Sequence, residues 1–246
     1  MMRIISLVPS LTELLFHLGL NDEVVGITKF CIHPKNWLHT KTHIGGTKNI
    51  HIDTIKGLQP SLVIANKEEN VKDQIEEIQH FTEVLLTDID TIDQALEAIV
   101  QIGNAVNKSF EAKELAHVLA EKIRSNKMPL VSKKALYFIW KVPYMVAAKN
   151  TFIDEMMRLA GFENGLKDAE RYPIVSEEEI KAIQPDYILL SSEPYPFKEK
   201  HIEAFQKITP SAKIILVDGE MFSWYGNRML LAVEYFKQLH FNIDKN

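Results

Sequence analysis

Three segments of the chain recur in the same order in its two halves, and this repetition constrains the fold more than any other feature of the sequence. The matched pairs are residues 12–19 with 154–161, 55–64 with 180–189, and 83–88 with 213–218. Helix–turn–strand units of any α/β protein resemble one another, which is the simpler explanation of such matches. Because all three pairs keep one order, we predict two lobes of like topology.

Apolar strand-like runs alternate with helix-like runs, which favours an α/β fold with parallel sheets. Three helix starts carry a capping-box pattern, in which side chains satisfy the first N–H groups of the helix: Ser10 with Glu13, Thr91 with Gln94, and Ser176 with Glu179. The first helix is expected to end at Gly19. Strands are predicted over residues 4–8, 24–28, 62–65, 83–87, 136–140, 187–191 and 214–217.

The longest helix-like stretch is residues 92–126, which has no proline and a single glycine, Gly103. Its apolar residues recur close to every 3.6 positions. A straight helix of that length would span roughly 50 Å, so it either bends into two helices or connects two bodies. We predict two Rossmann-like α/β lobes joined by a single long backbone helix, with domains at 1–90, 91–126 and 127–246. Lobes connected in this way would leave a ligand-binding cleft between them.

Composition excludes several classes of function. The net charge of −5 argues against binding a nucleic-acid backbone. One cysteine, Cys31, excludes an intramolecular disulfide, and no glycine-rich phosphate loop, G-x-S-x-G motif or H-E-x-x-H motif is present. Asp88, Asp90 and Thr91 imitate a phosphatase motif, but Thr91 is better explained as the cap of the following helix. We therefore expect no enzymatic activity, no intrinsic cofactor and no nucleic-acid partner, and we expect a monomer.

The N-terminus lacks the apolar segment and the small-residue cleavage site of a secretory leader. No apolar run reaches the 18 residues that a transmembrane helix requires. If the sequence is complete, these features predict a cytoplasmic protein.

Cys31 and His33 are candidate metal ligands, because residues i and i+2 of an extended segment point the same way. Three further histidines, His39, His43 and His51, follow closely in sequence. The alternative is a half-buried cysteine beside surface histidines, since this spacing matches no known metal signature.

Aromatic and cationic residues follow two of the predicted strands. Trp224, Tyr225 and Arg228 come after the strand at 214–217, and Trp140, Lys141 and Tyr144 occupy the end of the strand at 136–140. Such residues suit a flat ligand that carries some negative charge. The alternative for the first group is an aromatic plug that packs against its own loop.

With these motifs in place, the chain resembles the substrate-binding proteins of iron-siderophore and vitamin B12 ABC transporters. The resemblance rests on RIISLVPSLTE at 3–13, LQPSLVI at 58–64, AAKNTFI at 147–153, LAG at 159–161 and WYGNR at 224–228. It implies two α/β lobes bridged by one helix, a metal chelate as ligand and a membrane permease as partner. It also implies a periplasmic location if a leader has been removed.

The resemblance assigns roles to particular positions. Residues 30–34 match a segment that offers an aromatic ring to the ligand, with His33 where tyrosine is usual. Thr47 stands where the cobalamin binder has tryptophan, and Asn227 replaces a proline. Asp53 matches a permease-docking glutamate, and Glu193 is the candidate acid of the second lobe.

The sequence thus predicts a non-enzymatic solute-binding protein for a corrinoid or ferric siderophore, working with an ABC importer. The alternative is a cytosolic metal-ion-binding protein or enzyme that uses Cys31 and His33. The ligand would accordingly be cobalamin, a ferric chelate or a transition-metal ion. The candidate ligand contacts are Pro9, Ser10, Phe30, Cys31, His33, Thr47, Lys48, Trp140, Lys141, Tyr144, Trp224, Tyr225 and Arg228.

Overall fold

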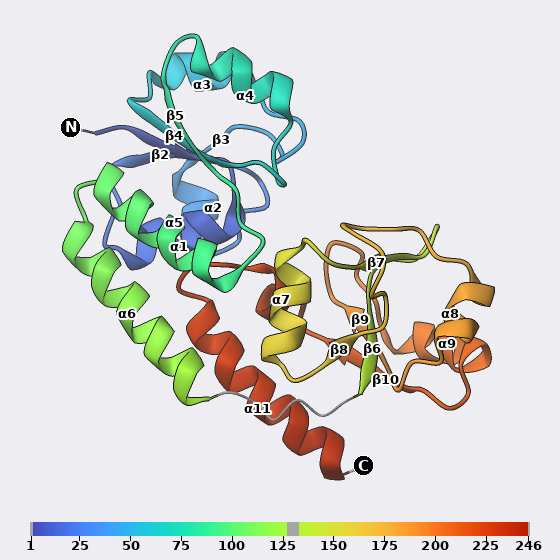
Figure 1. Ribbon diagram of the computed structural model, residues 1–246. Coiled ribbons are helices and arrows are strands. Elements are labelled where there is room, and N and C mark those ends of the chain that lie inside the picture. The colour runs from blue at the N-terminus through green and yellow to red at the C-terminus, as the bar shows by residue number, and fades with distance from the viewer. Residues whose placement is uncertain (1, 127–132, 246) are drawn as a thin grey trace. The chain divides into compact units, whose positions relative to one another are not determined.

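The computed structural model describes residues 2–126 and 133–245, and it divides into two compact units (Figure 1). Unit 1 contains Met1–Ile89, Asp93–Glu121 and Trp224–Met229, and unit 2 contains Asp90–Ile92, Lys122–Ser223 and Leu230–Asn246. The chain therefore returns to unit 1 for six residues, Trp224–Met229, late in its course. The domain boundary predicted at residue 127 lies outside the described residues.

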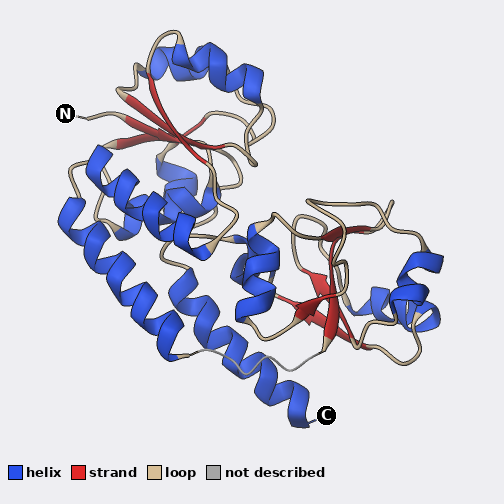
Figure 2. Ribbon diagram, viewed as in Figure 1, coloured by secondary structure: helices blue, strands red, loops and turns tan. Residues whose placement is uncertain are grey.

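Unit 1 is built on a parallel five-stranded sheet with the order β3-β2-β1-β4-β5. Figure 2 draws the strands in red and the helices in blue. The strands of unit 1 are β1 (Ile4–Ser6), β2 (Val24–Ile27), β3 (Thr42–His43), β4 (Leu62–Asn66) and β5 (Glu83–Thr87). Four short helices belong to it, α1 (Pro9–His17), α2 (Trp37–Thr40), α3 (Ile52–Leu58) and α4 (Lys72–Gln79). Residues of β1 and β4 are buried throughout, because a central parallel strand is covered on both faces.

Unit 2 is built on a second five-stranded sheet with the order β10-β9-β6-β7, and β8 also pairs with β6. Its strands are β6 (Lys134–Trp140), β7 (Met145–Ala147), β8 (Glu163–Asn164), β9 (Tyr187–Ser191) and β10 (Lys213–Val217). All pairings are parallel except β6 with β7, which is antiparallel. The helical elements are α7 (Phe152–Leu159), α8 (Glu177–Ile183), the short 3-10 helix η1 (Glu199–His201), α9 (Ile202–Ile208), α10 (Gly219–Ser223) and α11 (Met229–Lys245).

The two α/β lobes with largely parallel sheets agree with the predicted fold class, but the single long helix over 92–126 was wrong. The segment forms two helices, α5 (Ile92–Ala105) and α6 (Ser109–Ser125). Asn107 adopts a left-handed conformation (φ 60°), and α6 turns back along α5 (Figure 1). A Cβ on Gly103 would lie 2.1 Å from the Ala112 Cβ, so the glycine permits this close approach. The apolar residues of this segment recur at helical spacing without interruption, so the sequence pattern does not indicate the turn.

Two of the predicted helix caps can be compared with the structure, and they had different outcomes. Ser176 and Glu179 form the expected capping box at the start of α8. The box at Ser10 and Glu13 was wrong, because α1 begins at Pro9 after Val8, which makes no side-chain cap. Proline suits the first helical position, where its missing N–H costs nothing. Gly19 follows α1 with φ 79°, as the sequence predicted.

All seven predicted strands are present, with ends that differ by at most two residues. The sequence missed β3, β7 and β8, which have only two or three residues each; β3 and β8 are polar, and the apolar β7 is too short to stand out. Within the described residues, no helix is long and apolar enough to cross a membrane.

Candidate functional site

The segment Trp224–Met229 packs on α1 within unit 1. Gly226 has φ 99°, and a Cβ placed there would lie 3.4 Å from the Leu14 Cβ and 3.8 Å from the Ser10 carbonyl oxygen. Arg228 binds the Glu13 carboxylate through two bonds, Nε to Oε2 at 2.7 Å and Nη2 to Oε1 at 2.8 Å. Both side chains are largely buried. A bidentate pair of this kind fixes orientation as well as distance.

Trp224 contacts two other candidate residues. The Arg228 guanidinium carbon lies 4.8 Å from the centroid of the Trp224 ring, and the His33 ring meets Trp224 edge-on at 5.6 Å. Trp224 and Tyr225 are each only 6% exposed. The sequence-based alternative of a packed aromatic plug therefore describes these two rings better than an open ligand-facing surface does.

The predicted segment at 30–34 divides into an exposed and a buried part. Phe30 is 51% exposed, and the Lys29 ammonium lies 5.1 Å from its ring centroid. Cys31 is fully buried, where its sulfur accepts a hydrogen bond from the Thr12 hydroxyl at 3.0 Å and lies 3.2 Å from the Thr28 hydroxyl. Burial raises the pKa of the Cys31 thiol, and this disfavours the thiolate form that binds metals.

Cys31 and His33 therefore have different surroundings, the first in the core and the second half-buried against Trp224. His39, His43 and His51 are exposed. Across the described residues, no three His, Cys, Asp or Glu side chains gather closely enough to hold a metal ion.

The loop with Thr47 and Lys48 is fixed by two asparagines that the sequence analysis missed. The Asn70 amide donates to the carbonyl of Thr47 at 3.1 Å, and the Asn66 N–H donates to Asn70 Oδ1 at 2.9 Å. Thr47 is buried, whereas Lys48 is exposed and donates to the Glu68 carbonyl oxygen. The position of Asn66 at the carboxyl end of β4 could have indicated that this asparagine belongs to the site, since the ligand-binding loops of α/β proteins begin at the carboxyl ends of strands.

In unit 2, Trp140 ends β6 and is 40% exposed. Its indole N–H donates to the Val142 carbonyl at 3.1 Å, and Lys141 beside it is half-buried. Tyr144 instead packs on Phe138 and Phe205, and burial raises the pKa of its hydroxyl. Trp140 and Lys141 are thus accessible, and Tyr144 belongs partly to the core.

Two further residues that the sequence analysis missed support Trp140. Tyr195 meets Trp140 edge-on at 5.6 Å, and His201 lies beside Tyr195. The His201 Nδ1 accepts the Lys198 N–H at 2.9 Å. Burial, together with the charge of Lys141, lowers the pKa of His201 and favours its neutral form.

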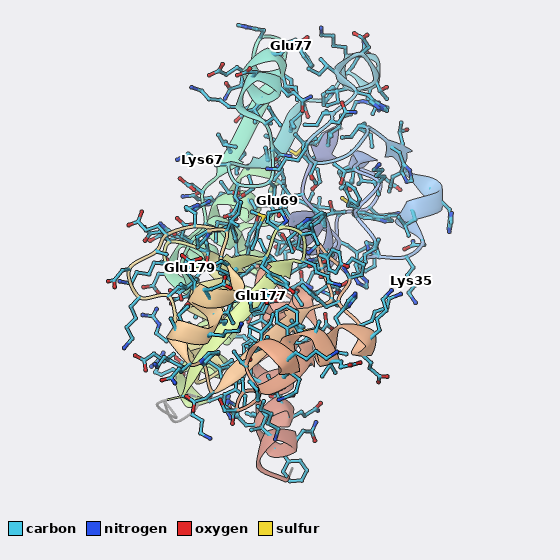
Figure 3. The ribbon with its side chains drawn as sticks, turned by 90° about the vertical axis from the view of Figure 1, so that its right-hand side faces the viewer. Lys35, Lys67, Glu69, Glu77, Glu177 and Glu179 are labelled. Carbon is cyan, nitrogen blue, oxygen red and sulfur yellow. The ribbon has the colours of Figure 1, made fainter. Side chains whose placement is uncertain are left out.

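Pro9 and Ser10 lie in the first turn of α1, where Ser10 is buried and Pro9 half-buried. Of the two docking candidates, Asp53 is exposed in the first turn of α3. Glu193 is half-buried and accepts the Ser223 hydroxyl at 2.9 Å. The internal repeat pairs Asp53 with Glu178 instead, which is exposed in the first turn of α8. Figure 3 labels its two neighbours in sequence, Glu177 and Glu179.

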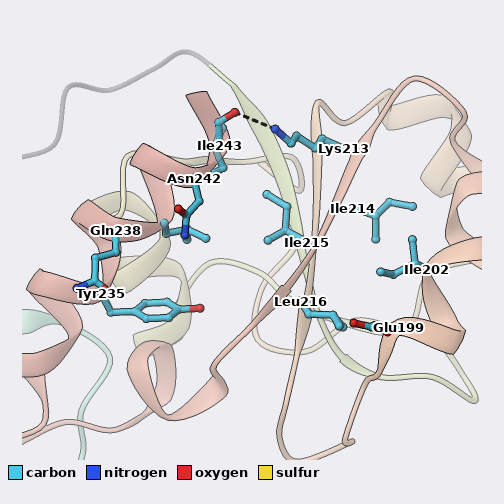
Figure 4. Close-up of a pocket in the computed structure, with 11 residues that line it drawn as sticks. Glu199, Ile202, Lys213, Ile214, Ile215, Leu216, Tyr235, Gln238, Asn242 and Ile243 are labelled. Atoms are coloured by element: carbon cyan, nitrogen blue, oxygen red, sulfur yellow. Dashed lines mark hydrogen bonds between the residues drawn. The ribbon is translucent and has the colours of Figure 1, made fainter. Parts of the chain in front are cut away.

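A cavity of about 400 Å³ in unit 2 lies apart from the candidate residues (Figure 4). It runs along β10, the edge strand, and α11, and Lys213 donates to the Ile243 carbonyl at one end. A second cavity of about 400 Å³ is lined by Tyr144 and by charged residues of α8 and α9. Only Tyr144 of the predicted ligand contacts lines either cavity.

The fold of two α/β units, each with a largely parallel sheet, is found in known solute receptors. The sequence pattern of the periplasmic binding protein family matches residues 4–210, and the chain belongs to that family. Its named members are substrate-binding proteins, so solute binding is the class of function, and the cytosolic alternative finds no support among the relatives.

Several named proteins are similar over nearly the whole chain. The vitamin B12-binding protein of Pectobacterium carotovorum is 22% identical, with 94% of this chain and 86% of that protein covered. The ABC transporter substrate-binding lipoprotein YvrC of Bacillus subtilis is 24% identical, with 94% and 77% covered. Among solved structures, the periplasmic heme-binding protein RhuT of Roseiflexus has a TM-score of 0.81 at 22% identity, with 94% and 95% covered. The vitamin B12-binding protein BtuF of Vibrio cholerae has a TM-score of 0.76 at 23% identity, with 96% of each chain covered.

Proposed function

We propose that this protein captures a metal chelate of the corrinoid, heme or ferric siderophore type and delivers it to an ABC importer. The observation that carries the proposal is a pair of exposed aromatic residues that follow strands of the two sheets: Phe30 follows β2, and Trp140 ends β6. Lys29 and Lys141 stand directly beside these rings in sequence. Apolar rings with neighbouring cations suit a flat ligand that carries carboxylates or other anionic groups.

The relatives support this ligand class, since several are named for binding vitamin B12 or heme, and one of the similar structures is named as a possible iron-binding protein. A name such as substrate-binding lipoprotein also supports work with an importer at the outer side of the cytoplasmic membrane. A bare metal ion is less well supported, because the Cys31 sulfur is buried in the core.

The test is a titration of the purified chain with cyanocobalamin, hemin, ferrichrome and Zn²⁺, followed by thermal unfolding and visible absorbance. We expect one of the three chelates to stabilise the protein, by about 2.7 kcal/mol at a concentration of 100 Kd. Phe30→Ala and Trp140→Ala should each weaken that binding about tenfold or more. Phe110→Ala is the control, because Phe110 is also exposed (72%) but lies on α6. Binding of Zn²⁺ alone, or of no probe, would contradict the proposal.

For the importer, we propose that Asp53 and Glu178 are the docking acids of the two units. Their support is the repeat: the residues hold equivalent, exposed positions in the first turns of α3 and α8. Exposed carboxylates steer association with a basic partner. Asp53→Lys and Glu178→Lys should each reduce capture by a cognate ABC importer reconstituted in proteoliposomes, whereas Glu193→Gln should not. Equal capture by all three variants would contradict this assignment.

A further inference from the structure

The residue of most interest outside the predicted contacts is Glu13, which the sequence analysis treated only as part of a helix cap. It lies on α1, and its carboxylate accepts two hydrogen bonds from Arg228, 215 residues later in the chain. Its side chain is 15% exposed and that of Arg228 8%. A buried ion pair is a weak source of net stability compared with apolar packing, but it specifies one arrangement when its hydrogen bonds are made.

The ion pair of Glu13 and Arg228 also fixes the position of the neighbouring Trp224 ring. Arg228 places its guanidinium over the Trp224 ring at 4.8 Å, and Trp224 meets the half-buried His33 ring edge-on at 5.6 Å. The contacts therefore run from Glu13 through Arg228 and Trp224 to His33. Glu13 and His33, at the two ends of this run, are partly exposed, whereas Arg228 and Trp224 between them are almost fully buried.

We propose that Glu13 is a positioning residue for ligand capture, which acts through Arg228 and Trp224 to fix the imidazole of His33 beside the ligand. This inference rests on the proposed function. It assigns the ligand contact to His33 and a supporting role to Trp224. A side chain held by packed neighbours keeps its geometry better than one on a mobile loop.

The internal repeat offers a matched control. Glu155 on α7 holds the position of Glu13 in unit 2, and its side chain is similarly buried, at 18% exposed. Its carboxylate pairs with Arg158, three residues further along the same helix. Glu155→Gln thus removes a carboxylate of similar burial without disturbing any contact with Trp224.

The first experiment reads the geometry without any ligand, using protein labelled with 5-fluorotryptophan. The chain has three tryptophans, and single Trp→Phe variants assign their ¹⁹F signals. We expect Glu13→Gln to shift the Trp224 signal and to leave the Trp37 and Trp140 signals in place, whereas Glu155→Gln shifts none. An unmoved Trp224 signal in folded Glu13→Gln overturns the positioning role, whatever the protein binds.

The second experiment measures affinity for cyanocobalamin and hemin. Glu13→Gln should lower the affinity for whichever of these probes the wild type binds by roughly tenfold. Residues that orient a binding group act on this scale. Glu155→Gln should bind like the wild type. Wild-type affinity in folded Glu13→Gln overturns the inference, whereas a wild type that binds neither probe but binds ferrichrome moves the same measurement to ferrichrome. If the wild-type protein binds none of the three chelates, the proposed function is contradicted. The role of Glu13 in ligand capture is then contradicted as well, even if the Trp224 signal moves.

A reciprocal exchange, Glu13→Arg with Arg228→Glu, separates positioning from stability if Glu13→Gln folds poorly. It restores the ion pair but removes the cation from the Trp224 ring. We expect the midpoint of thermal unfolding to return to the wild-type value, whereas the affinity for the ligand should stay reduced. Recovery of both would show that the pair acts only on stability and would overturn the inference.

Discussion

Units 1 and 2 repeat one another in backbone geometry but differ in their long-range polar contacts. The helices α3 and α8 both end at a left-handed glutamine, Gln59 (φ 46°, ψ 58°) and Gln184 (φ 49°, ψ 61°). Gly19 and Gly161, which follow α1 and α7, have φ values of 79° and 81°. These matches confirm the predicted repeat at the level of local geometry.

Strand register follows the same repeat. Leu62 pairs with Glu83 between β4 and β5, and Tyr187 pairs with Lys213 between β9 and β10, at equivalent positions. The sheets differ beyond their shared strands, since β1 is followed by the parallel β2 and β3 in unit 1, whereas its equivalent β6 pairs with the antiparallel β7 at the edge of unit 2. The comparison teaches that the repeated scaffold positions the loops, while the loops and the contacts they make distinguish the two units.

The largest effect on stability is expected at the clearest difference between the units, the ion pair of Glu13 and Arg228 in unit 1. Arg228→Ala leaves the buried carboxylate of Glu13 without its partner, and we expect a loss of about 3–5 kcal/mol in the free energy of unfolding. Arg158→Ala, at the exposed end of a pair within α7, should cost less than about 0.5 kcal/mol. Urea denaturation of both variants checks this, and similar losses would contradict it.

A smaller effect is expected at the starts of α3 and α8. Ser176 accepts the Glu179 N–H at 3.2 Å, whereas His51, at the equivalent position of α3, makes no side-chain cap. Ser176→Ala should cost about 1 kcal/mol and His51→Ala clearly less. Thermal unfolding of the two variants measures the difference, and a larger loss at His51 would show that the caps are not the cause.

The smallest effect on stability is expected from a substitution that makes the helices α3 and α8 more alike. Gly57 in α3 occupies the position of Ala182 in α8, and a Cβ there would meet nothing within 4 Å. Gly57→Ala should therefore stabilise the chain by about 0.5–1 kcal/mol, because alanine loses less backbone entropy in a helix. Ala182→Gly should destabilise it by a similar amount. A destabilised Gly57→Ala variant would mean that α3 is constrained by more than its own helix.

Much of the fold could be predicted because its signals are local. Apolar runs gave the strands, and the Ser176–Glu179 pattern gave the start of α8. The turn at Asn107 was missed because it depends on Gly103 meeting Ala112, a contact that no helical period contains. The Ser10–Glu13 cap was wrong because the helix already begins at Pro9, which places Ser10 inside it, and Glu13 binds Arg228 from a distant part of the chain.

Of the candidate site, residue types and strand ends were predictable, but burial was not. Phe30 and Trp140 are exposed as a ligand contact requires, whereas Cys31, Trp224 and Tyr225 are not. Sequence alone could not separate these cases, because an aromatic ring at a strand end suits a ligand and a packed core equally well.

By itself, the sequence determined the two-lobed α/β class, the repeat and the family, because periodicity and turn chemistry act over a few residues. Only the tertiary structure decided that Trp224–Met229 belongs to unit 1, that Glu13 binds Arg228 and that Cys31 lies in the core. Those contacts join residues far apart in the chain, and their energies depend on what surrounds them after folding.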